Sequence, residues 1–405
     1  MLWLYNFGIF FYSLIIKVLA NFNPKAKLFI QGRQKLFQRI SQEVSPEHKH
    51  IWFHFASLGE FEQGRPVLEK VKEKYKEKKI IITFFSPSGY EVRKNYPGVD
   101  GIFYLPLDTA SNAELFISLI NPEIAIFTKY EFWYHYFHLL QKKDIPLFLI
   151  SGIFRPDQIF FKWYGGFQRK ILKCITHLFV QNETSLHLLE KIHLKNISLS
   201  GDTRFDRVFE NASSVKGVPL VEAFVGKNPV FIAGSTWPQD EFLLQSLIAQ
   251  YPDWKVIIAP HEIGKSHLSQ LEQLFPSAIK YSQLQNASVT SNILIIDNIG
   301  LLSGLYQYGK IAYIGGGFGA GIHNTLEAAA FGLPVIFGPE YHKFQEAKDL
   351  ISLKAAISIR NEYDLVKAFE NFNSSNQYGK TAKAYVEQKK GATMGIMLEM
   401  EKYLS

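Results

Sequence analysis

The segment around Gly316 contains the residue types and spacings best suited to ligand binding. Residues 311–339 read IAYIGGGFGAGIHNTLEAAAFGLPVIFGP, which predicts a strand, a glycine loop, a short helix and a second strand. Five glycines in the loop, including Gly316 and Gly321, let the backbone adopt positive φ and let a ligand approach the main chain closely. The segment therefore predicts a turn that contacts a ligand through its backbone.

The short helix of this turn is expected to begin at Thr325. Asn324, followed three residues later by Glu327, is a variant of the capping box that marks a helix start. The positive helix end and its free N–H groups would then face the glycine loop, which suits a phosphate. Glu327 either caps its own helix or accepts hydrogen bonds from sugar hydroxyls. We predict nucleotide or phosphate binding, with a plain tight crossover as the alternative.

Polar residues also follow two apolar runs in the first half of the chain. Glu60 comes shortly after residues 51–55, where it is either a general base or only a helix-favouring acid. The segment SPSGYE follows the next run and supplies Ser86, Ser88 and Gly89. These three residues predict either a phosphate cradle or an ordinary turn.

The second half repeats this pattern at the ends of two more apolar runs. GSTW supplies Ser235 and Thr236, and APHE supplies Pro260 and His261. Each segment is weak evidence alone, but polar residues recur at predicted strand ends in both halves. In open parallel sheets, ligands bind at the carboxyl ends of the strands.

Composition limits the class of protein. A chain of 405 residues predicts two domains, each long enough for its own core. The single Cys174 excludes a disulfide framework and suggests a reducing compartment. The twelve histidines lack zinc-like spacing, so the sequence predicts no metal site.

The N-terminus differs from the rest of the chain. Residues 2–16 carry no charge, and residues 1–42 contain six basic residues and no acidic one. We predict a membrane anchor and a basic collar over residues 1–40, which would attract anionic lipid and remain cytoplasmic. This charge distribution argues against nucleic-acid binding, which needs a basic surface on the folded domain. The alternatives are a cleaved signal peptide and an amphipathic helix packed on its own domain. The basic residues after Lys17 are Lys25, Lys27, Arg33, Lys35 and Arg39.

Apolar runs alternate with helix-length stretches through the remaining sequence. This alternation predicts an α/β fold with doubly wound parallel sheets, interrupted by a linker-like stretch, NASSVKGVP. We expect two Rossmann-like domains, at 41–215 and 216–376, that face each other across a cleft, as in GT-B glycosyltransferases. A final helix is expected over 377–405, where Met394, Met397 and Met400 have helical spacing and are expected to pack.

Over nearly its whole length the chain resembles the Kdo (3-deoxy-D-manno-octulosonic acid) transferases of lipopolysaccharide synthesis. The shared motifs are SLGE, PSGYE, YLPLD, YEFWY, GDTRFD, AGST and the glycine turn. The resemblance implies a GT-B enzyme that transfers Kdo from CMP-Kdo to a lipid A precursor of the lipid IVA type. It also implies inversion, no metal or other cofactor, and a location at the cytoplasmic face of the inner membrane.

By position in these motifs, Glu60 matches the family's catalytic base, and Gly321, Asn324 and Glu327 match the loop that holds the cytidine nucleotide. The chain departs from the family at APHE, where an arginine is usual, and at KYE, which keeps only Glu131 of the usual ETE. The predicted donor contacts are Ser235, Thr236, Pro260, His261, Gly316, Gly321, Asn324 and Glu327. The predicted acceptor or cleft residues are Ser86, Ser88, Gly89, Glu131, Arg155 and Arg204.

Two other classes of protein remain open at this point. One is a GT-B glycosyltransferase or epimerase that uses a UDP-sugar, which would share the glycine turn but leave the N-terminal anchor unexplained. The other is a non-catalytic, membrane-tethered protein that binds sugar nucleotides, which would tolerate any residue at position 60.

Overall fold

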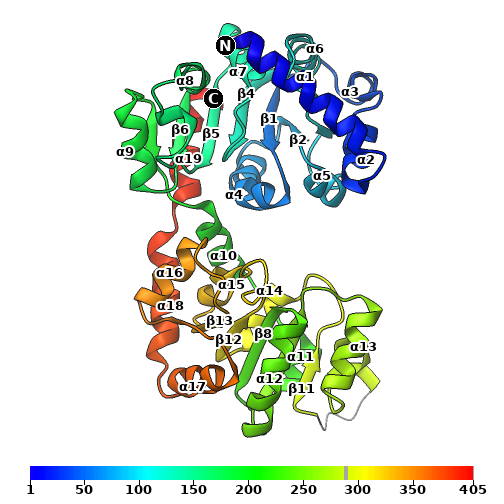
Figure 1. Cartoon of the computed structure of the whole chain (residues 1–405), viewed down its shortest axis with the longest axis vertical. Coiled ribbons are helices and arrows are strands. Elements are labelled where there is room, and N and C mark those ends of the chain that lie inside the picture. Colours follow the sequence, from blue (N-terminus) through cyan, green and yellow to red (C-terminus); the bar gives the residue numbers. More distant parts are fainter. Residues whose placement is uncertain (287–290, 405) are drawn as a thin grey trace. The chain divides into compact units, whose positions relative to one another are not determined.

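The computed structural model describes residues 1–286 and 291–404, and these residues form two compact units. Unit 1 comprises Met1–Asp206 and Lys390–Ser405, and unit 2 comprises Arg207–Lys389 (Figure 1). Ser405, at the end of the predicted final helix, and residues 287–290 of the predicted donor domain lie outside the described residues.

Unit 1 is built on a parallel sheet of seven strands in the order β3-β2-β1-β4-β5-β6-β7. The strands are β1 (His50–Phe55), β2 (Lys79–Phe84), β3 (Gly101–Tyr104), β4 (Pro122–Thr128), β5 (Leu147–Gly152), β6 (His177–Val180) and β7 (Ile197–Leu199). The helices are α1 (Leu2–Leu19), α2 (Pro24–Gln31), α3 (Leu36–Glu43), α4 (Leu58–Lys74), α5 (Pro87–Arg93), α6 (Ala110–Ile120), α7 (Tyr134–Lys142), η1 (Ile159–Phe161), α8 (Gly166–Leu172), α9 (Glu183–Lys191) and α10 (Thr203–Ser213), which crosses into unit 2.

Both faces of this sheet are buried, because successive side chains of its apolar strands point to opposite sides. Trp52 lies in the core shared with α3, α6 and α7, whereas Phe53 lies in the core shared with α4. Because both faces are buried, successive residues of each strand are mostly apolar and do not alternate with polar ones.

Unit 2 repeats this plan with a parallel sheet of seven strands in the order β10-β11-β9-β8-β12-β13-β14. The strands are β8 (Val230–Thr236), β9 (Lys255–Pro260), β10 (Ile279–Lys280), β11 (Ile293–Ile295), β12 (Ile311–Ile314), β13 (Val335–Phe337) and β14 (Ala356–Ser358). The helices are α11 (Pro219–Val225), α12 (Pro238–Gln250), α13 (Lys265–Leu274), η2 (Tyr281–Asn286), α14 (Leu302–Leu305), η3 (Tyr306–Tyr308), α15 (Thr325–Ala330), α16 (Gln345–Ser352), α17 (Glu362–Asn373) and α18 (Gln377–Lys389). The prediction of two Rossmann-like sheets is confirmed.

The end of the chain differs from the single helix predicted over 377–405. Gly391 has a φ of 115°, which interrupts the helix and separates α18 from α19 (Ala392–Leu404). Helix α19 belongs to unit 1 (Figure 1). Met397 and Met400 are buried in the core that α4 also lines. Met394 is exposed, so only two of the three methionines pack as expected.

The boundary between the units also differs from the predicted one at 215/216. The division falls inside α10, between Asp206 and Arg207, although the linker-like stretch begins at residue 211. The Asp206 carboxylate accepts hydrogen bonds from the backbone N–H and hydroxyl of Thr393, at 2.7 and 2.8 Å. The first turn of α10 is thereby held to the start of α19 within unit 1.

Helix α1 is long and apolar enough to cross a membrane, by length and composition alone. None of its residues is buried, and Trp3 and Phe10 are among its most exposed side chains. One side of the helix nevertheless contacts unit 1, because the Tyr5 hydroxyl donates to Asp108 and the Asn6 side-chain oxygen lies 2.7 Å from His135 Nε2. The helix therefore lies against the domain and keeps most of its apolar surface exposed.

The predicted basic collar is wrong in two residues, Arg33 and Arg39, and Arg39 Nη2 donates to the Ile102 carbonyl at 3.3 Å. Arg33 donates to the backbone carbonyls of Phe29, Phe85 and Leu105 at 3.1, 2.9 and 2.9 Å. Its guanidinium is therefore engaged within unit 1. A local count of charges cannot detect this contact, because two of the three acceptors are more than fifty residues away in the sequence.

Candidate active site

Glu60 lies at the carboxyl end of β1, in the first turn of α4. Ser57 is the N-cap residue of α4, and its hydroxyl lies 3.2 Å from Glu60 Oε2, to which it donates. The buried strand β1 ends at Phe55, so the turn that follows carries Glu60 to the edge of the sheet. This is the position that the sequence predicts for it.

Burial and a nearby carboxylate make Glu60 a stronger base than an ordinary glutamate. Burial is the largest cause that raises the pKa of Glu60 from its ordinary 4.5 to about 7, and the charge of Glu131 raises it further. Lys129 and the Ser57 hydroxyl act in the opposite direction. A carboxylate with this pKa accepts a proton effectively near neutral pH.

Glu131 reaches the same edge of the sheet from the segment that follows β4, the strand next to β1. Its Oε2 accepts a hydrogen bond from Trp133 Nε1 at 2.8 Å and lies 3.4 Å from His54 Nε2. Burial lowers the pKa of His54, so its imidazole is neutral. Sequence reasoning missed His54, because a histidine inside an apolar strand gives no sign of its partners.

The SPSGYE turn lies beside the Ser57 turn. Ser86 is the N-cap residue of α5, and its hydroxyl lies 3.0 Å from that of Ser88. A side chain at Gly89 would come within 2.3 Å of Phe84 and 3.1 Å of the Ser57 backbone. Close packing of the two turns explains why position 89 is a glycine, and the cap explains the serine at position 86. The hydroxyls of Ser86 and Ser88 remain exposed.

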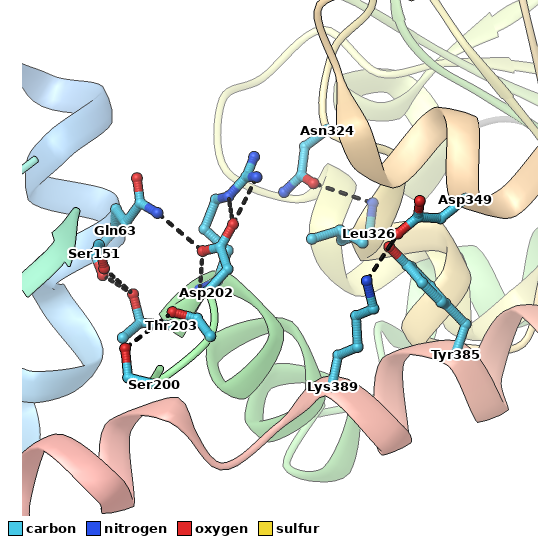
Figure 2. Close-up of polar contacts among 12 residues, drawn as sticks. Gln63, Ser151, Ser200, Asp202, Thr203, Asn324, Leu326, Asp349, Tyr385 and Lys389 are labelled. Atoms are coloured by element: carbon cyan, nitrogen blue, oxygen red, sulfur yellow. Dashed lines mark hydrogen bonds and ion pairs between the residues drawn. The ribbon is translucent and has the colours of Figure 1, made fainter. Parts of the chain in front are cut away.

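The two predicted arginines have contacts of their own. Arg155 lies on the loop after β5, and its Nη2 is 3.4 Å from the Tyr130 hydroxyl. Arg204 pairs with Asp202 through Nε at 2.8 Å and Nη2 at 2.7 Å. Asp202 also accepts from Gln63 Nε2 at 2.9 Å (Figure 2). Asp202 thereby joins the start of α10 to Gln63 of α4 and also pairs with Arg204, whose acceptor role stays a prediction.

The glycine loop of unit 2 has the backbone geometry that the sequence predicts. Gly316 and Gly321 have φ values of 89° and 133°, which side-chain-bearing residues rarely adopt. Helix α15 begins at Thr325, as predicted, and Asn324 is its N-cap residue. The Asn324 side chain accepts from the backbone N–H of Leu326 at 3.1 Å (Figure 2). It also donates to Glu327 Oε1 at 3.1 Å.

Asp240 supports this loop from the first turn of α12. It is buried, and its carboxylate accepts from the backbone N–H groups of Gly316 and Trp237, both at 2.9 Å, and from the Tyr313 hydroxyl at 2.6 Å. Sequence reasoning did not include Asp240. Its position three residues after Trp237, at the start of a helix, is the signal that would have identified it.

A stack of aromatic rings lies beside the loop. His261, which follows β9, stacks on both Trp237 and His323, with ring centroids 4.9 and 4.3 Å away. Trp237 Nε1 donates to His323 Nε2 at 3.2 Å. Burial, followed by the charge of His261, lowers the pKa of His323 to about 4, so its neutral ring is a hydrogen-bond acceptor.

Ser235 and Thr236 end β8 beside this stack. Ser235 has a φ of 53°, a conformation costly for a residue other than glycine and often found at functional sites. Thr236 is buried, and its hydroxyl donates to Glu241 Oε1 at 2.8 Å. Pro260 is buried at the end of β9, where the His261 N–H donates to the Thr236 carbonyl at 2.9 Å.

The unit 2 site therefore offers backbone N–H groups, a helix start, stacked rings and Glu327, which suit a phosphorylated nucleoside. The unit 1 site offers a carboxylate of raised pKa beside a second carboxylate. Within residues 1–286 and 291–404, no group of three or more His, Cys, Asp or Glu side chains could hold a metal ion.

Comparison with known proteins shows which families the chain is similar to. The sequence model of the family described as 3-deoxy-D-manno-octulosonic-acid transferase (kdotransferase) matches residues 31–207. The 3-deoxy-D-manno-octulosonic acid transferase of Aquifex aeolicus is 27% identical over 86% of this chain and 92% of its own length. A bifunctional glycosyltransferase/methyltransferase of Fusobacterium nucleatum is 24% identical over 95% of this chain, which spans 62% of that relative.

A solved structure shows the same fold. UDP-GlcNAc 2-epimerase from Neisseria meningitidis, bound to UDP-GlcNAc, aligns with a TM-score of 0.61 at 14% identity, over 86% of this chain and 98% of that one. The two parallel Rossmann-like sheets define a GT-B-like α/β fold. The chain is thus similar to the 3-deoxy-D-manno-octulosonic acid (Kdo) transferases, through the family model over residues 31–207 and through relatives 25–27% identical over most of the chain.

Proposed function

We propose that the protein transfers Kdo from CMP-Kdo to a lipid A precursor of the lipid IVA type, with inversion at the anomeric carbon. The main support is Glu60, a partly buried carboxylate at a strand end whose pKa is raised to about 7. The acceptor is a neutral sugar hydroxyl, and its attack requires a base to take the proton. Glu60 is that base, and a retaining or non-catalytic protein would not need it in this form.

The glycine loop and the aromatic stack of unit 2 hold the donor in this proposal. CMP leaves as a phosphate monoester, and backbone N–H groups of the loop and of the start of α15 stabilise its charge. Glu327 accepts hydrogen bonds from the ribose hydroxyls. His261 takes the place of the family's usual arginine near the phosphate, because it follows β9 where that arginine is expected.

The acceptor approaches unit 1 from a membrane surface. Helix α1 exposes Trp3, Phe7 and Phe10, and the exposed Lys25 and Lys27 follow it. An apolar helix with an exposed Trp, followed by basic residues, favours an interface that contains anionic lipid. We propose that the protein acts at the cytoplasmic face of the inner membrane, where Ser86, Ser88, Arg155 and Glu131 lie on the acceptor side.

Product analysis tests this function. The full chain in detergent is incubated with CMP-Kdo and a purified lipid A precursor, and mass spectrometry follows the lipid. We expect Kdo to be added, and CMP rather than UDP to inhibit the reaction. Failure to modify the lipid, together with UDP binding in preference to CMP, would favour a protein that uses a UDP-sugar.

A further inference from the structure

A chain of buried polar side chains runs through the sheet of unit 1 and ends at Glu131. It consists of Trp52 and His54 on β1, Thr83 on β2, and Glu131 itself. The first three are completely buried, and His54 and Thr83 are paired neighbours in the register of β1 and β2. Buried polar groups in an apolar sheet are costly unless they are hydrogen-bonded, so their arrangement needs an explanation.

The distances assign a direction to each hydrogen bond at Thr83. Trp52 Nε1 lies 2.8 Å from Thr83 Oγ1, and an indole can only donate. His54 Nδ1 also lies 2.8 Å from Thr83 Oγ1, while the Phe53 carbonyl is 3.4 Å away. The single hydroxyl hydrogen is therefore better placed to bond with His54 Nδ1, which then accepts.

The other end of the imidazole agrees with this direction. If Nδ1 accepts, the neutral ring carries its hydrogen on Nε2 and donates it to Glu131 Oε2 at 3.4 Å. The opposite tautomer would direct the Nε2 lone pair at a carboxylate oxygen. A charged ring is disfavoured because burial, assisted by the nearby Arg33, lowers the pKa of His54, although Glu131 and a backbone hydrogen bond at Thr83 act to raise it.

Glu131 is fixed by this chain. Its Oε2 has N–H groups of both Trp133 and His54 directed at it, so the carboxylate has little freedom to rotate. Its charge acts on Glu60, which also faces Lys129 and the Ser57 hydroxyl. Burial is the largest cause of the raised pKa of Glu60, and the position at which the chain holds Glu131 sets the next largest.

We propose that Thr83 and His54 are positioning residues, which lock the Nε2–H tautomer of His54 and thereby hold the Glu131 carboxylate beside Glu60. This inference rests on the proposed role of Glu60 as the catalytic base. It assigns Glu131 to tuning that base, in place of binding the acceptor. Hydrogen bonds behind reactive groups commonly act in this way.

The first test does not depend on activity. Two-bond ¹H–¹⁵N NMR correlations of the full chain in detergent distinguish the two tautomers, and the His54 signals are assigned by their loss in His54→Asn. We expect the Nε2–H form in the wild type and in Thr83→Ser, and a change of tautomer in Thr83→Val. An Nδ1–H or a charged His54 in the wild type at pH 7 would overturn the proposal.

The second test measures the proton affinity of Glu60 by ¹³C NMR of labelled carboxyl groups, assigned by Glu60→Gln. Glu131→Gln should lower the pKa of Glu60. Thr83→Val should also change the Glu60 pKa, whereas Thr83→Ser should leave it at the wild-type value. The matched control is Thr128→Val, because among the described residues the buried Thr128 hydroxyl has no hydrogen-bond partner. A Glu60 pKa that is the same in Glu131→Gln as in the wild type would refute the tuning role.

The third measurement is the pH dependence of transfer. Thr83→Val should reduce turnover by about two- to tenfold, the equivalent of one lost hydrogen bond, and should move the acidic limb of the profile. A lower melting temperature with an unchanged profile would show a purely structural role. Absence of transfer by the wild type would count against the proposed function alone, because the two NMR measurements decide the positioning role independently.

Discussion

Replacement of Glu60 by Gln should abolish transfer while the donor still binds. Gln keeps the size of the side chain and can still accept the hydrogen bond from Ser57, which is 3.2 Å long in the wild type. It cannot accept a proton at neutral pH. General-base catalysis supplies about 10²- to 10⁴-fold in rate, so turnover should fall by that factor. A side chain that only favoured its helix start would contribute roughly 0.3 to 1 kcal/mol and leave turnover almost unchanged.

The same raised pKa predicts the pH dependence of the wild type. Glu60 has a pKa of about 7 and acts only when deprotonated, so activity should fall on the acidic side of neutrality. One pH unit below the pKa, about a tenth of the molecules retain the charged base, so kcat/KM should fall about tenfold per pH unit there. The acidic limb should be absent from the residual activity of Glu60→Gln.

Glu60→Gln should lower activity but raise the free energy of unfolding above neutral pH. The pKa of Glu60 rises from 4.5 to about 7 on folding, so the folded state resists its charge. This cost is fully present above pH 7 and disappears as the pH falls below 4.5. Each pKa unit corresponds to about 1.36 kcal/mol, so Glu60→Gln should be more stable than the wild type at pH 8 by up to roughly 3 kcal/mol.

The assay combines turnover, calorimetric titration with CMP and thermal unfolding at pH 5 and pH 8 on the same two proteins. Turnover of Glu60→Gln within a few-fold of the wild type would remove Glu60 as the base. Equal unfolding temperatures at pH 8 would show instead that the carboxylate is not appreciably desolvated in the folded state.

Three further predictions concern the donor loop and the N-terminus. Glu327→Ala should weaken CMP binding by about ten- to 150-fold, the equivalent of 1.5 to 3 kcal/mol for a hydrogen bond to a charged group; a lowered melting temperature with unchanged affinity in calorimetry would leave Glu327 as a helix cap only. Asp240→Ala should destabilise the protein by about 3 kcal/mol or more, because buried N–H groups lose their acceptor. Asp240→Asn keeps an acceptor and should cost less in a urea titration, and equal costs would contradict this reasoning. Removal of residues 1–20 should give a more soluble protein that still modifies detergent-dispersed acceptor, because Asp108 keeps backbone N–H donors at 3.0 and 3.1 Å after the loss of Tyr5; loss of the circular dichroism signal would show that α1 is part of the fold.

Features that depend on short-range interactions could be predicted from the sequence. The helix start at Thr325 follows from Asn324 and Glu327, because a cap forms between residues two or three apart. The buried strands follow from continuous apolar runs, and Glu60 lies at the end of one because the chain must turn there. Segment order and motif spacing were sufficient to indicate the family.

Long-range contacts decided the properties that matter for chemistry. The pKa of Glu60 depends on burial and on Glu131, which follows a different strand and is 71 positions away in the sequence (131 − 60). The partners of His54 come from β2 and from the segment after β4, and no local pattern specifies which strands are neighbours. Arg33 reads as a surface charge in sequence, yet it bonds to carbonyls that only the folded sheet brings near. Hydrogen bonds and desolvation depend on three-dimensional proximity, so the sequence could indicate a carboxylate at this edge, while the tertiary structure determined how strong a base it is.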